Sequence, residues 1–386
     1  MMTAGVGRVL RAPQVGRVLL GSLVGRLPLG AAPLALLIFA RATMSLAAAA
    51  LLVAAYTAGV AIGGPALARA ADRWRQPPVL WGAAVASSVG FALVAVGLPV
   101  AGAVPAAALA GLGAPPFEAC LRVLWRDLLP AGAVATAYTL DIAAQELIFI
   151  AGPLATVAAV AGFGSAAGLV AAALFQFGGT VGFATAPAVR RWRGEPAHRH
   201  WLGALRSAPL RLILVAVVLV GLGVGSVVVA ATAYAEARGS TASAGWLISA
   251  QAVGALAGGL AYTRVGAAGS AWRLPVIAAA RAVSYLPLLI QPGPVVMLAL
   301  MFASGVGLPV LLTVGFLTVD EVAPPGTAAE AFAWVGTAFA VGSAAGSALT
   351  GAAVEAAGSV RVGFAVAPAA IALAAALLTR LSTMEE

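Results

Sequence analysis

Charged residues are scarce in this chain of 386 residues, and lysine is missing altogether. Only 9% of the residues are charged, and every basic residue is an arginine. A soluble domain carries about 25% charged residues. A chain this poor in charge cannot cover a water-facing surface, so lipid must be the solvent for most of it. The composition therefore excludes a soluble enzyme.

Other absences narrow the chemistry. Without lysine the chain cannot form the phosphate-binding loop G-x-x-x-x-G-K-[ST], which argues against ATP-driven transport by this chain alone. Its single cysteine, Cys120, excludes an internal disulfide and a multi-cysteine metal site. Histidine is absent from every apolar stretch, and no G-x-S-x-G elbow occurs. We expect no catalysis, no cofactor and no metal.

Long apolar runs dominate the chain, in which 62% of the residues are hydrophobic. A membrane-spanning helix needs about 20 mainly apolar residues. Continuous runs of this length indicate helices, because a spanning strand would alternate over about 10 residues. Twelve helices are predicted, at 15–39, 46–68, 78–99, 104–125, 134–157, 163–186, 209–235, 244–263, 274–290, 294–317, 327–353 and 360–380.

The arginines predict the orientation of these helices. If the N-terminus is cytoplasmic, seventeen arginines fall in inner segments and only three, Arg41, Arg238 and Arg361, in outer ones. This asymmetry predicts that both termini are cytoplasmic. The net charge of +9 then faces anionic lipid rather than nucleic acid. Richness in Ala, Gly and Arg without Lys is typical of a high-GC bacterium, so we expect a monomer in a bacterial cell membrane.

A polar stretch near the middle divides the chain into two halves. We expect a six-helix bundle over 1–186, a cytoplasmic linker over 187–208 and a second bundle over 209–386. An internal repeat supports this division. Gly59, Gly63, Gly64 and Arg69 in the second helix recur as Gly254, Gly258, Gly259 and Arg264 in the eighth, at a constant offset of 195 residues. Duplication explains the shared position and spacing.

The strongest local motif is GGPALARAADRWRQPPVL, residues 63–80, between the second and third helices. Asp72 can accept hydrogen bonds from the start of a neighbouring helix or pair with an arginine, and so hold two bundles together in one state. The alternative is a turn whose arginines only set topology.

This loop resembles that of the major facilitator superfamily, in which a glycine-rich helix end leads to Asp-Arg. Gly63, Arg69, Asp72 and Arg73 match, whereas Arg75 replaces the usual glycine. The chain also resembles bacterial drug exporters of that superfamily, in four further stretches: 114–128, 137–154, 245–260 and 321–351. The resemblance implies twelve helices in two pseudo-symmetric bundles and transport by alternating access. Gly152-Pro153 resembles an antiporter motif and favours export.

Ionisable residues at membrane depth are costly, so each is a functional candidate. Glu146 lies near the middle of the fifth helix, Glu118 at mid-depth in the fourth, and Asp141 one to two turns from Glu146. A desolvated carboxyl group can bind and release protons near neutral pH. Arg26 in the first helix should meet a carboxylate, with Glu118 and Glu146 as candidate partners. A structural ion pair between helices is the alternative for each.

Charged residues at the cytoplasmic helix ends are candidates for a gate. We group Asp72, Arg73 and Arg69 with Arg122 and Asp127 of the fourth helix; the alternative for the last two is a snorkelling helix end. Asp320 and Glu321 are further candidates for this gate. Glu330 follows Thr327 at capping-box spacing and is expected to cap the eleventh helix.

Polar and aromatic side chains inside the bundles suit an amphipathic organic substrate. The cavity candidates are Gln145, Tyr234 and Gln251, although Tyr234 could equally belong to an interfacial aromatic belt. The favoured hypothesis is proton-coupled export of a small molecule. Proton-coupled uptake of a metabolite and a non-transporting receptor or scaffold with the same fold remain open.

Overall fold

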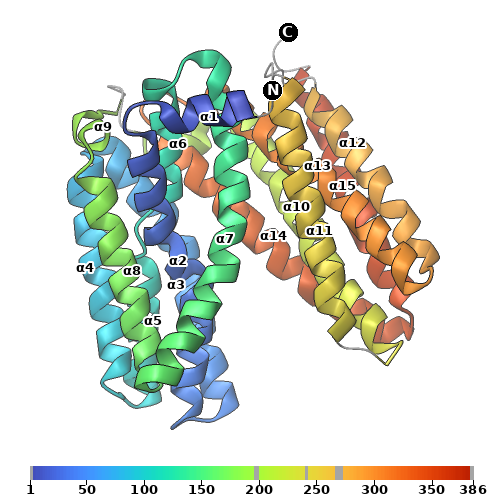
Figure 1. The fold of residues 1–386 in the computed structure, drawn as a ribbon, viewed down its shortest axis with the longest axis horizontal. Coiled ribbons are helices and arrows are strands. Elements are labelled where there is room, and N and C mark those ends of the chain that lie inside the picture. The colour runs from blue at the N-terminus through green and yellow to red at the C-terminus, as the bar shows by residue number, and fades with distance from the viewer. Residues whose placement is uncertain (1–2, 195–199, 240–241, 266–272, 383–386) are drawn as a thin grey trace.

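The structure is a computed structural model that describes residues 3–194, 200–239, 242–265 and 273–382. It consists almost entirely of helices (Figure 1). No strand occurs in these ranges. Twelve spans are long and apolar enough to cross a membrane, which is the number predicted from the apolar runs. The chain is therefore an all-α, multi-pass membrane protein, as predicted.

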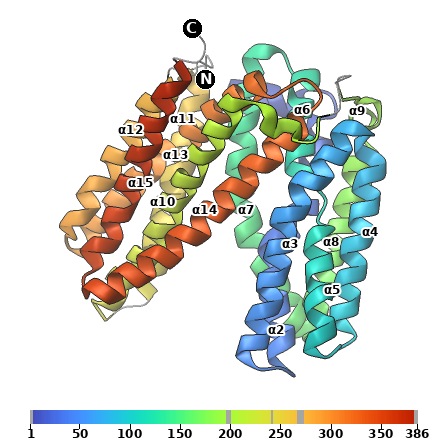
Figure 2. The ribbon, with the colours of Figure 1, turned by 180° about the vertical axis from the view of Figure 1, so that it is seen from behind.

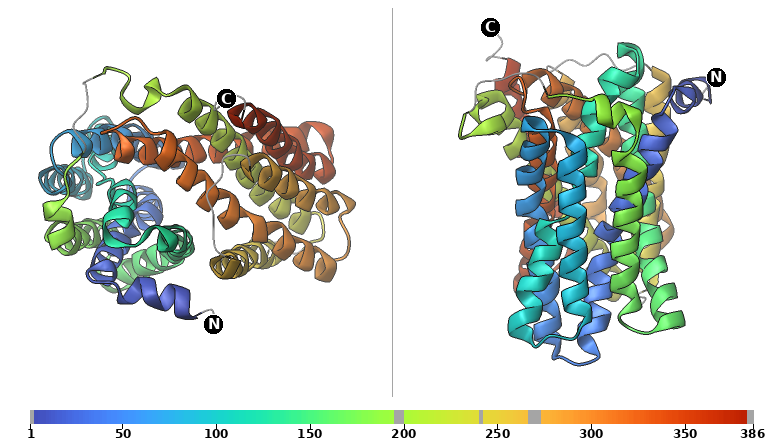
Figure 3. Two further views of the ribbon diagram at one scale, coloured as in Figure 1. Left: turned by 90° about the horizontal axis from the view of Figure 1, so that it is seen from above. Right: turned by 90° about the vertical axis from the view of Figure 1, so that its left-hand side faces the viewer.

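The helices form two groups that follow the chain order (Figures 1 and 3). The first half contains α1 (Thr3–Arg11), α2 (Val15–Arg41), α3 (Leu46–Arg73), α4 (Gln76–Ala95), α5 (Val100–Leu112), α6 (Phe117–Leu128), α7 (Ala131–Phe163) and α8 (Ala167–Ala184). The second half contains α10 (Ala208–Glu236), α11 (Ala242–Val265), α12 (Arg273–Tyr285), η2 (Leu286–Ile290), α13 (Pro294–Val322), α14 (Ala328–Ala357) and α15 (Val360–Ser382). Between them lie α9 (Pro187–Arg191) and the 3₁₀ turn η1 (Gly203–Arg206).

The two halves share an apolar core at one end only. One large buried cluster draws residues from both halves, including Ala68 and Tyr138 from the first and Phe316 and Val335 from the second. Two smaller clusters are each confined to one half. In Figures 1 and 2 the halves touch at the end that carries both termini and diverge toward the opposite end. The halves are thus joined at the termini end and separate at the other.

The repeated glycines allow the same close helix–helix contact in both halves. A Cβ on Gly59 of α3 would lie 2.5 Å from the carbonyl oxygen of Ala108 in α5. In the second half, a Cβ on Gly254 of α11 would overlap the carbonyl of Phe302 in α13. Small residues therefore let the equivalent helix pair approach closely in each half. The same contact at the same repeat position supports duplication.

Replacing Gly258 by alanine should lower the melting temperature of the purified protein in detergent. Its Cβ would overlap the backbone carbonyl of Val306, which cannot move aside alone. Overpacking of this kind costs about 1–3 kcal/mol. Gly64→Ala is the matched control, because nothing lies within 4 Å of a Cβ there. Equal decreases for the two variants would contradict this account of the α11–α13 contact.

The fourth predicted helix, 104–125, is not continuous. It breaks into α5 and α6 at Gly113–Pro116, although the two pieces together still form one span, Val100–Leu128. Pro115 and Pro116 carry no N–H and cannot continue the hydrogen-bond ladder of α5. The break places Glu118 in the first turn of α6 rather than inside a continuous helix. A carboxylate is favoured there by the helix dipole.

Candidate functional site

Two arginines and two carboxylates lie together inside the first half. We call Arg26, Glu118, Arg122 and Asp141 the buried charge cluster. The side chains of Arg26 and Arg122 are 2% exposed, that of Asp141 is fully buried and that of Glu118 is 25% exposed. With all four groups ionised the cluster is neutral. A buried set of charges is tolerated when each charge has an opposite partner.

Every member of the buried charge cluster touches members of opposite charge. The Nη1 of Arg26 donates to Asp141 Oδ1 at 2.6 Å, and its Nη2 lies 3.6 Å from Glu118 Oε2. Arg122 pairs with Glu118 and lies 3.3 Å, through Nε, from Asp141 Oδ2. Gln145 accepts a further hydrogen bond from Arg26 at 2.8 Å. The cluster thereby ties α2, α6 and α7 together.

Small residues bring α2 and α7 close enough for these contacts. A Cβ on Gly30 would lie 2.6 Å from the carbonyl oxygen of Ile148, and a Cβ on Gly152 would lie 2.8 Å from the backbone nitrogen of Ala31. Larger side chains at either glycine would push the helices apart. Gly152 therefore has a packing role against α2.

The partner of Arg26 differs in part from the prediction. Glu118 is a partner as expected, but Asp141 is closer, and Glu146 is not within reach. Asp141 and Gln145 are four residues apart and share the face of α7 that meets α2. Glu146 is one residue further and points away. Its side chain is exposed, and no hydrogen bond or ion pair is recorded for it among the described residues.

Glu146 instead lies on the face of α7 that is turned toward the second half. Thr139, two helical turns earlier on the same face, contacts Thr313 of α13 with 3.1 Å between the hydroxyl oxygens. Since α7 rises about 1.5 Å per residue, Glu146 lies about 10 Å beyond this contact, toward the end where the halves diverge.

Asp72 joins the two halves at the termini end. Its carboxylate accepts hydrogen bonds from the backbone N–H groups of Ala329 at 3.2 Å and Glu330 at 2.8 Å, in the first turn of α14. The carboxylate is 7% exposed. The first N–H groups of a helix have no partner within it and carry the positive end of its dipole. Of the two partners considered for Asp72, a helix start and an arginine, the structure shows the helix start.

The expected capping role of Glu330 is wrong. Thr327, at the N-cap of α14, makes no side-chain capping hydrogen bond, and its hydroxyl donates to the carbonyl three residues back. The carboxylate of Glu330 lies 3.5 Å from Arg69 Nε, across the two halves. Asp72 from the first half caps α14 instead. A cap supplied from 257 residues away leaves no local sequence pattern.

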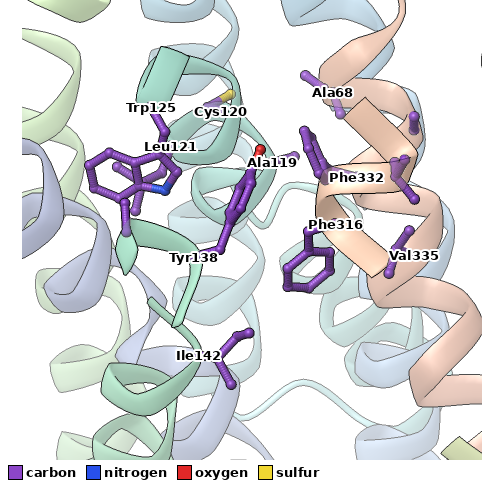
Figure 4. Packing of buried hydrophobic residues seen from close by; sticks show 14 of the residues in the cluster. Ala68, Ala119, Cys120, Leu121, Trp125, Tyr138, Ile142, Phe316, Phe332 and Val335 are labelled. Carbon is purple, nitrogen blue, oxygen red and sulfur yellow. The ribbon is translucent and has the colours of Figure 1, made fainter. Parts of the chain in front are cut away.

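A second set of contacts joins α6 and α7 to α13 and α14. Arg126 pairs with Asp320, whose carboxylate also accepts from the Tyr138 hydroxyl at 3.4 Å. The Tyr138 ring packs against Phe316 and Phe332, with ring centroids 5.7 and 6.0 Å apart. Figure 4 shows Tyr138 facing these two phenylalanines across the interface. Aromatic packing and one ion pair thus reinforce the contact made by Asp72.

Arg122 belongs both to the buried charge cluster and to this interface. Its guanidinium carbon lies 3.7 Å above the centre of the Phe316 ring, a cation–π contact with the second half. The same guanidinium pairs with Glu118 and Asp141. Arg122 therefore links the two carboxylates to Phe316 of the second half. The signal in the sequence was the four-residue spacing of Glu118 and Arg122, which places both on one helix face.

The remaining gate candidates lie at the surface. Arg73 and Asp127 are exposed, and no hydrogen bond or ion pair of Asp127 is recorded within the described part of the chain. Arg69, by contrast, donates to the carbonyls of His200 and Trp201 at 2.7 and 2.6 Å besides approaching Glu330. It therefore holds the segment between the halves against the end of α3.

Two cavity candidates, Tyr234 and Gln251, lie in the second half, away from the buried charge cluster. Tyr234 donates to the carbonyl of Pro292 at 2.5 Å, near the C-terminal end of α10 and just after η2. Gln251 of α11 is partly exposed. Its Nε2 lies 3.4 Å from the Tyr285 hydroxyl and 3.3 Å from Ser304 Oγ.

Several solved transporters are similar in structure to this chain. No family model and no curated protein matches the sequence. The chain is similar to a bacterial homologue of the iron transporter ferroportin in an outward-facing state (TM-score 0.70, 16% identity, 95% of this chain and 99% of that one). It is also similar to the E. coli fucose:proton symporter FucP (0.73, 12%, 96% and 99%) and to the major facilitator superfamily proton:xylose symporter XylE (0.69, 16%, 100% of both). The predicted major facilitator fold is confirmed.

Proposed function

We propose that the chain is a secondary active transporter that moves a small organic molecule across the membrane by alternating access. The observation that carries the proposal is the distribution of contacts. The halves share a core and polar contacts at one end and have separate cores at the other. Such a molecule can open one side while closing the other. The moving units are the bundles 1–186 and 209–386 of a single copy, joined by the linker 187–208.

The arginine distribution supports a cytoplasmic position for the closed end. That end carries both termini and the segment around η1 (Figure 1). On this reading the site between the halves opens to the outside of a bacterial cell membrane. Asp72 on α14, Arg69 with Glu330, and Arg126 with Asp320 hold the cytoplasmic side closed.

The buried charge cluster supports proton coupling. One added proton leaves a net positive charge in a dry site, which is unfavourable unless the contacts rearrange. Glu118 is the carboxylate for this step because it is the more exposed of the two, whereas Asp141 is fully buried. Protonated Glu118 would release Arg122, which packs on Phe316 across the interface. Glu146, on the face turned toward the second half, is the second candidate.

Export in exchange for protons is the direction we favour, on the resemblance to drug exporters and the Gly152-Pro153 pair. The two symporters among the similar structures show that the fold serves proton symport as well. Oriented vesicles decide between them. Purified protein in right-side-out vesicles, with a dye reporting internal pH, is given a panel of amphipathic compounds under an imposed pH gradient. Accumulation driven by an acid exterior would overturn export, and the absence of any flux would overturn transport.

Glu118→Gln should uncouple substrate movement from protons. The amide keeps the size of the side chain but cannot release a proton. Coupling between two ligands is typically about 5–150-fold, and we expect most of it to vanish while substrate binding remains. Glu355→Gln, which changes an exposed glutamate of α14, is the matched control and should leave coupled flux unchanged. If Glu146→Gln uncouples transport and Glu118→Gln does not, Glu146 is the coupling group.

A further inference from the structure

Among the described residues, one arginine of the second half is buried without an acidic partner. Arg281 of α12 is 2% exposed. Its Nη1 donates to the carbonyl of Ser304 at 3.1 Å, its Nη2 donates to the Tyr285 hydroxyl, and its Nε has no acceptor. No aspartate or glutamate occurs in the sequence between residues 237 and 319. The positive charge of Arg281 is therefore not balanced by any described residue around it.

The first half shows how the same chain treats buried arginines elsewhere. Arg26 and Arg122 share two carboxylates, so their site is neutral. An isolated guanidinium at membrane depth is expensive, and such residues pair with an opposite charge or a backbone carbonyl and mark the path of a substrate or ion. Arg281 has only a hydroxyl and a carbonyl as partners among the described residues, and its Nε–H has no acceptor there, so the site has room for a negative charge that the described residues do not supply.

The position of the cluster suits a molecule held between the halves. Gly259 of α11 meets Thr139 of α7, since a Cβ there would lie 3.2 Å from Thr139 Cγ2. Gln251 lies eight residues from Gly259 toward the open end, which is about 12 Å along α11. Glu146 lies about 10 Å from Thr139 in the same direction. Gln251 and its partners are therefore at about the depth of Glu146, in the opposite half.

Gln251 is the member of this cluster through which a ligand can reach the arginine. Arg281, Tyr285 and Ser304 are buried, whereas Gln251 is partly exposed. The Tyr285 hydroxyl connects the amide of Gln251 to the guanidinium of Arg281, because both groups contact it. The buried apolar side chains Leu247 and Met301 belong to the same cluster as Tyr285. These surroundings suit the organic part of a ligand better than a strongly hydrated inorganic anion.

We infer that Arg281, Tyr285 and Gln251 form a binding site for the carboxylate of an organic acid, which is the anionic group of the transported molecule. Binding of the carboxylate does not depend on the proposed transport function; only the statement that the bound molecule is transported rests on it. The guanidinium supplies the charge, the Tyr285 hydroxyl and the Gln251 amide supply further donors, and the Ser304 carbonyl holds the guanidinium in place. Bidentate pairing with a planar fork makes arginine well suited to a carboxylate.

A matched pair of substitutions tests the charge imbalance without any ligand. Gln251→Glu would supply the missing negative charge and should raise the melting temperature of the purified protein by a few degrees. Gln145→Glu makes the same change beside Arg26, where the charges are already balanced, and should lower it. Decreases of similar size for both variants would show that Arg281 needs no anion.

Ligand binding gives the second test, with benzoate as the probe and benzamide as its neutral equivalent. Because a ligand that binds the folded state stabilises it, benzoate should raise the melting temperature of the wild-type protein. Benzamide should not, and inorganic phosphate should have a much smaller effect. The benzoate shift should disappear in Arg281→Gln and in Gln251→Glu. Equal shifts for benzoate and benzamide, no shift for either, or a benzoate shift that survives Arg281→Gln would overturn the site.

The vesicle experiment and the benzoate experiment test transport and the carboxylate site separately. If neutral compounds move across vesicles and benzoate does not bind, transport stands and the carboxylate site is wrong. If benzoate binds through Arg281 and no compound moves in either direction, the site stands and the transport proposal is wrong.

Discussion

Arg26→Gln is expected to destabilise the protein by about 3–5 kcal/mol, the cost of leaving a buried charge without its partner. The substitution removes the 2.6 Å contact with Asp141, whose carboxylate is fully buried. It also leaves Arg122 as the single cation facing two carboxylates. Unfolding of the purified protein in detergent, followed by circular dichroism, measures the loss.

Arg17→Gln is the matched control on the same helix. Arg17 donates to the carbonyl of Gly182 at 3.3 Å and to the Thr185 hydroxyl at 2.7 Å, but the side chain is exposed. Surface changes of this kind usually stay within about 0.5 kcal/mol. The double variant Arg26→Gln/Asp141→Asn removes both charges and should recover a large part of the stability. Equal losses from Arg17 and Arg26 would refute the assignment of the buried charge cluster as a stabilising unit.

Asp72→Ala should open the termini end of the molecule. The change removes both hydrogen bonds to the first turn of α14 and leaves its N–H groups uncapped. Hydrogen bonds to a charged group contribute about 1.5–3 kcal/mol, and every 1.4 kcal/mol is about tenfold in an equilibrium. Because the loss of even one such bond corresponds to about tenfold, we expect the open form of this end to gain at least about tenfold in population.

Distances between spin labels measure this change directly. Cysteines at Trp74 and Pro325, both exposed and placed just after α3 and just before α14, report on the separation of the halves. Asp72→Ala should broaden the distance distribution and add longer distances. Asp127→Ala removes an exposed carboxylate at the same end and should leave the distribution unchanged. Matching distributions for the two variants would mean that Asp72 does not hold the halves together.

The fold was predictable because hydropathy is a local property. Each apolar run reports its own preference for lipid, whatever the other runs do, so the twelve spans and the helical class followed from the sequence. The glycine repeat added the two-half architecture. What hydropathy could not show was the break at Gly113–Pro116, because the two pieces together still average as one apolar span, Val100–Leu128. The two prolines were the available signal for it.

The polar residues that form buried contacts were predictable, but their pairings were not. Arg26, Glu118, Asp141, Gln145 and Asp72 could be chosen from the sequence because a polar group in an apolar run is conspicuous. Which carboxylate lies closest to Arg26 depends on how far α7 is rotated about its own axis, and the structure shows that it is Asp141.

The pairings between the two halves could not be predicted from the sequence either, because they also depend on how the helices are rotated and packed. Glu330 lies at the spacing of a capping residue, yet Asp72 caps the helix and Glu330 faces Arg69. The sequence by itself determined which segments enter the lipid and which charges they carry there. Only the tertiary structure decided which charges meet, because helix rotation and depth depend on packing between segments more than a hundred residues apart.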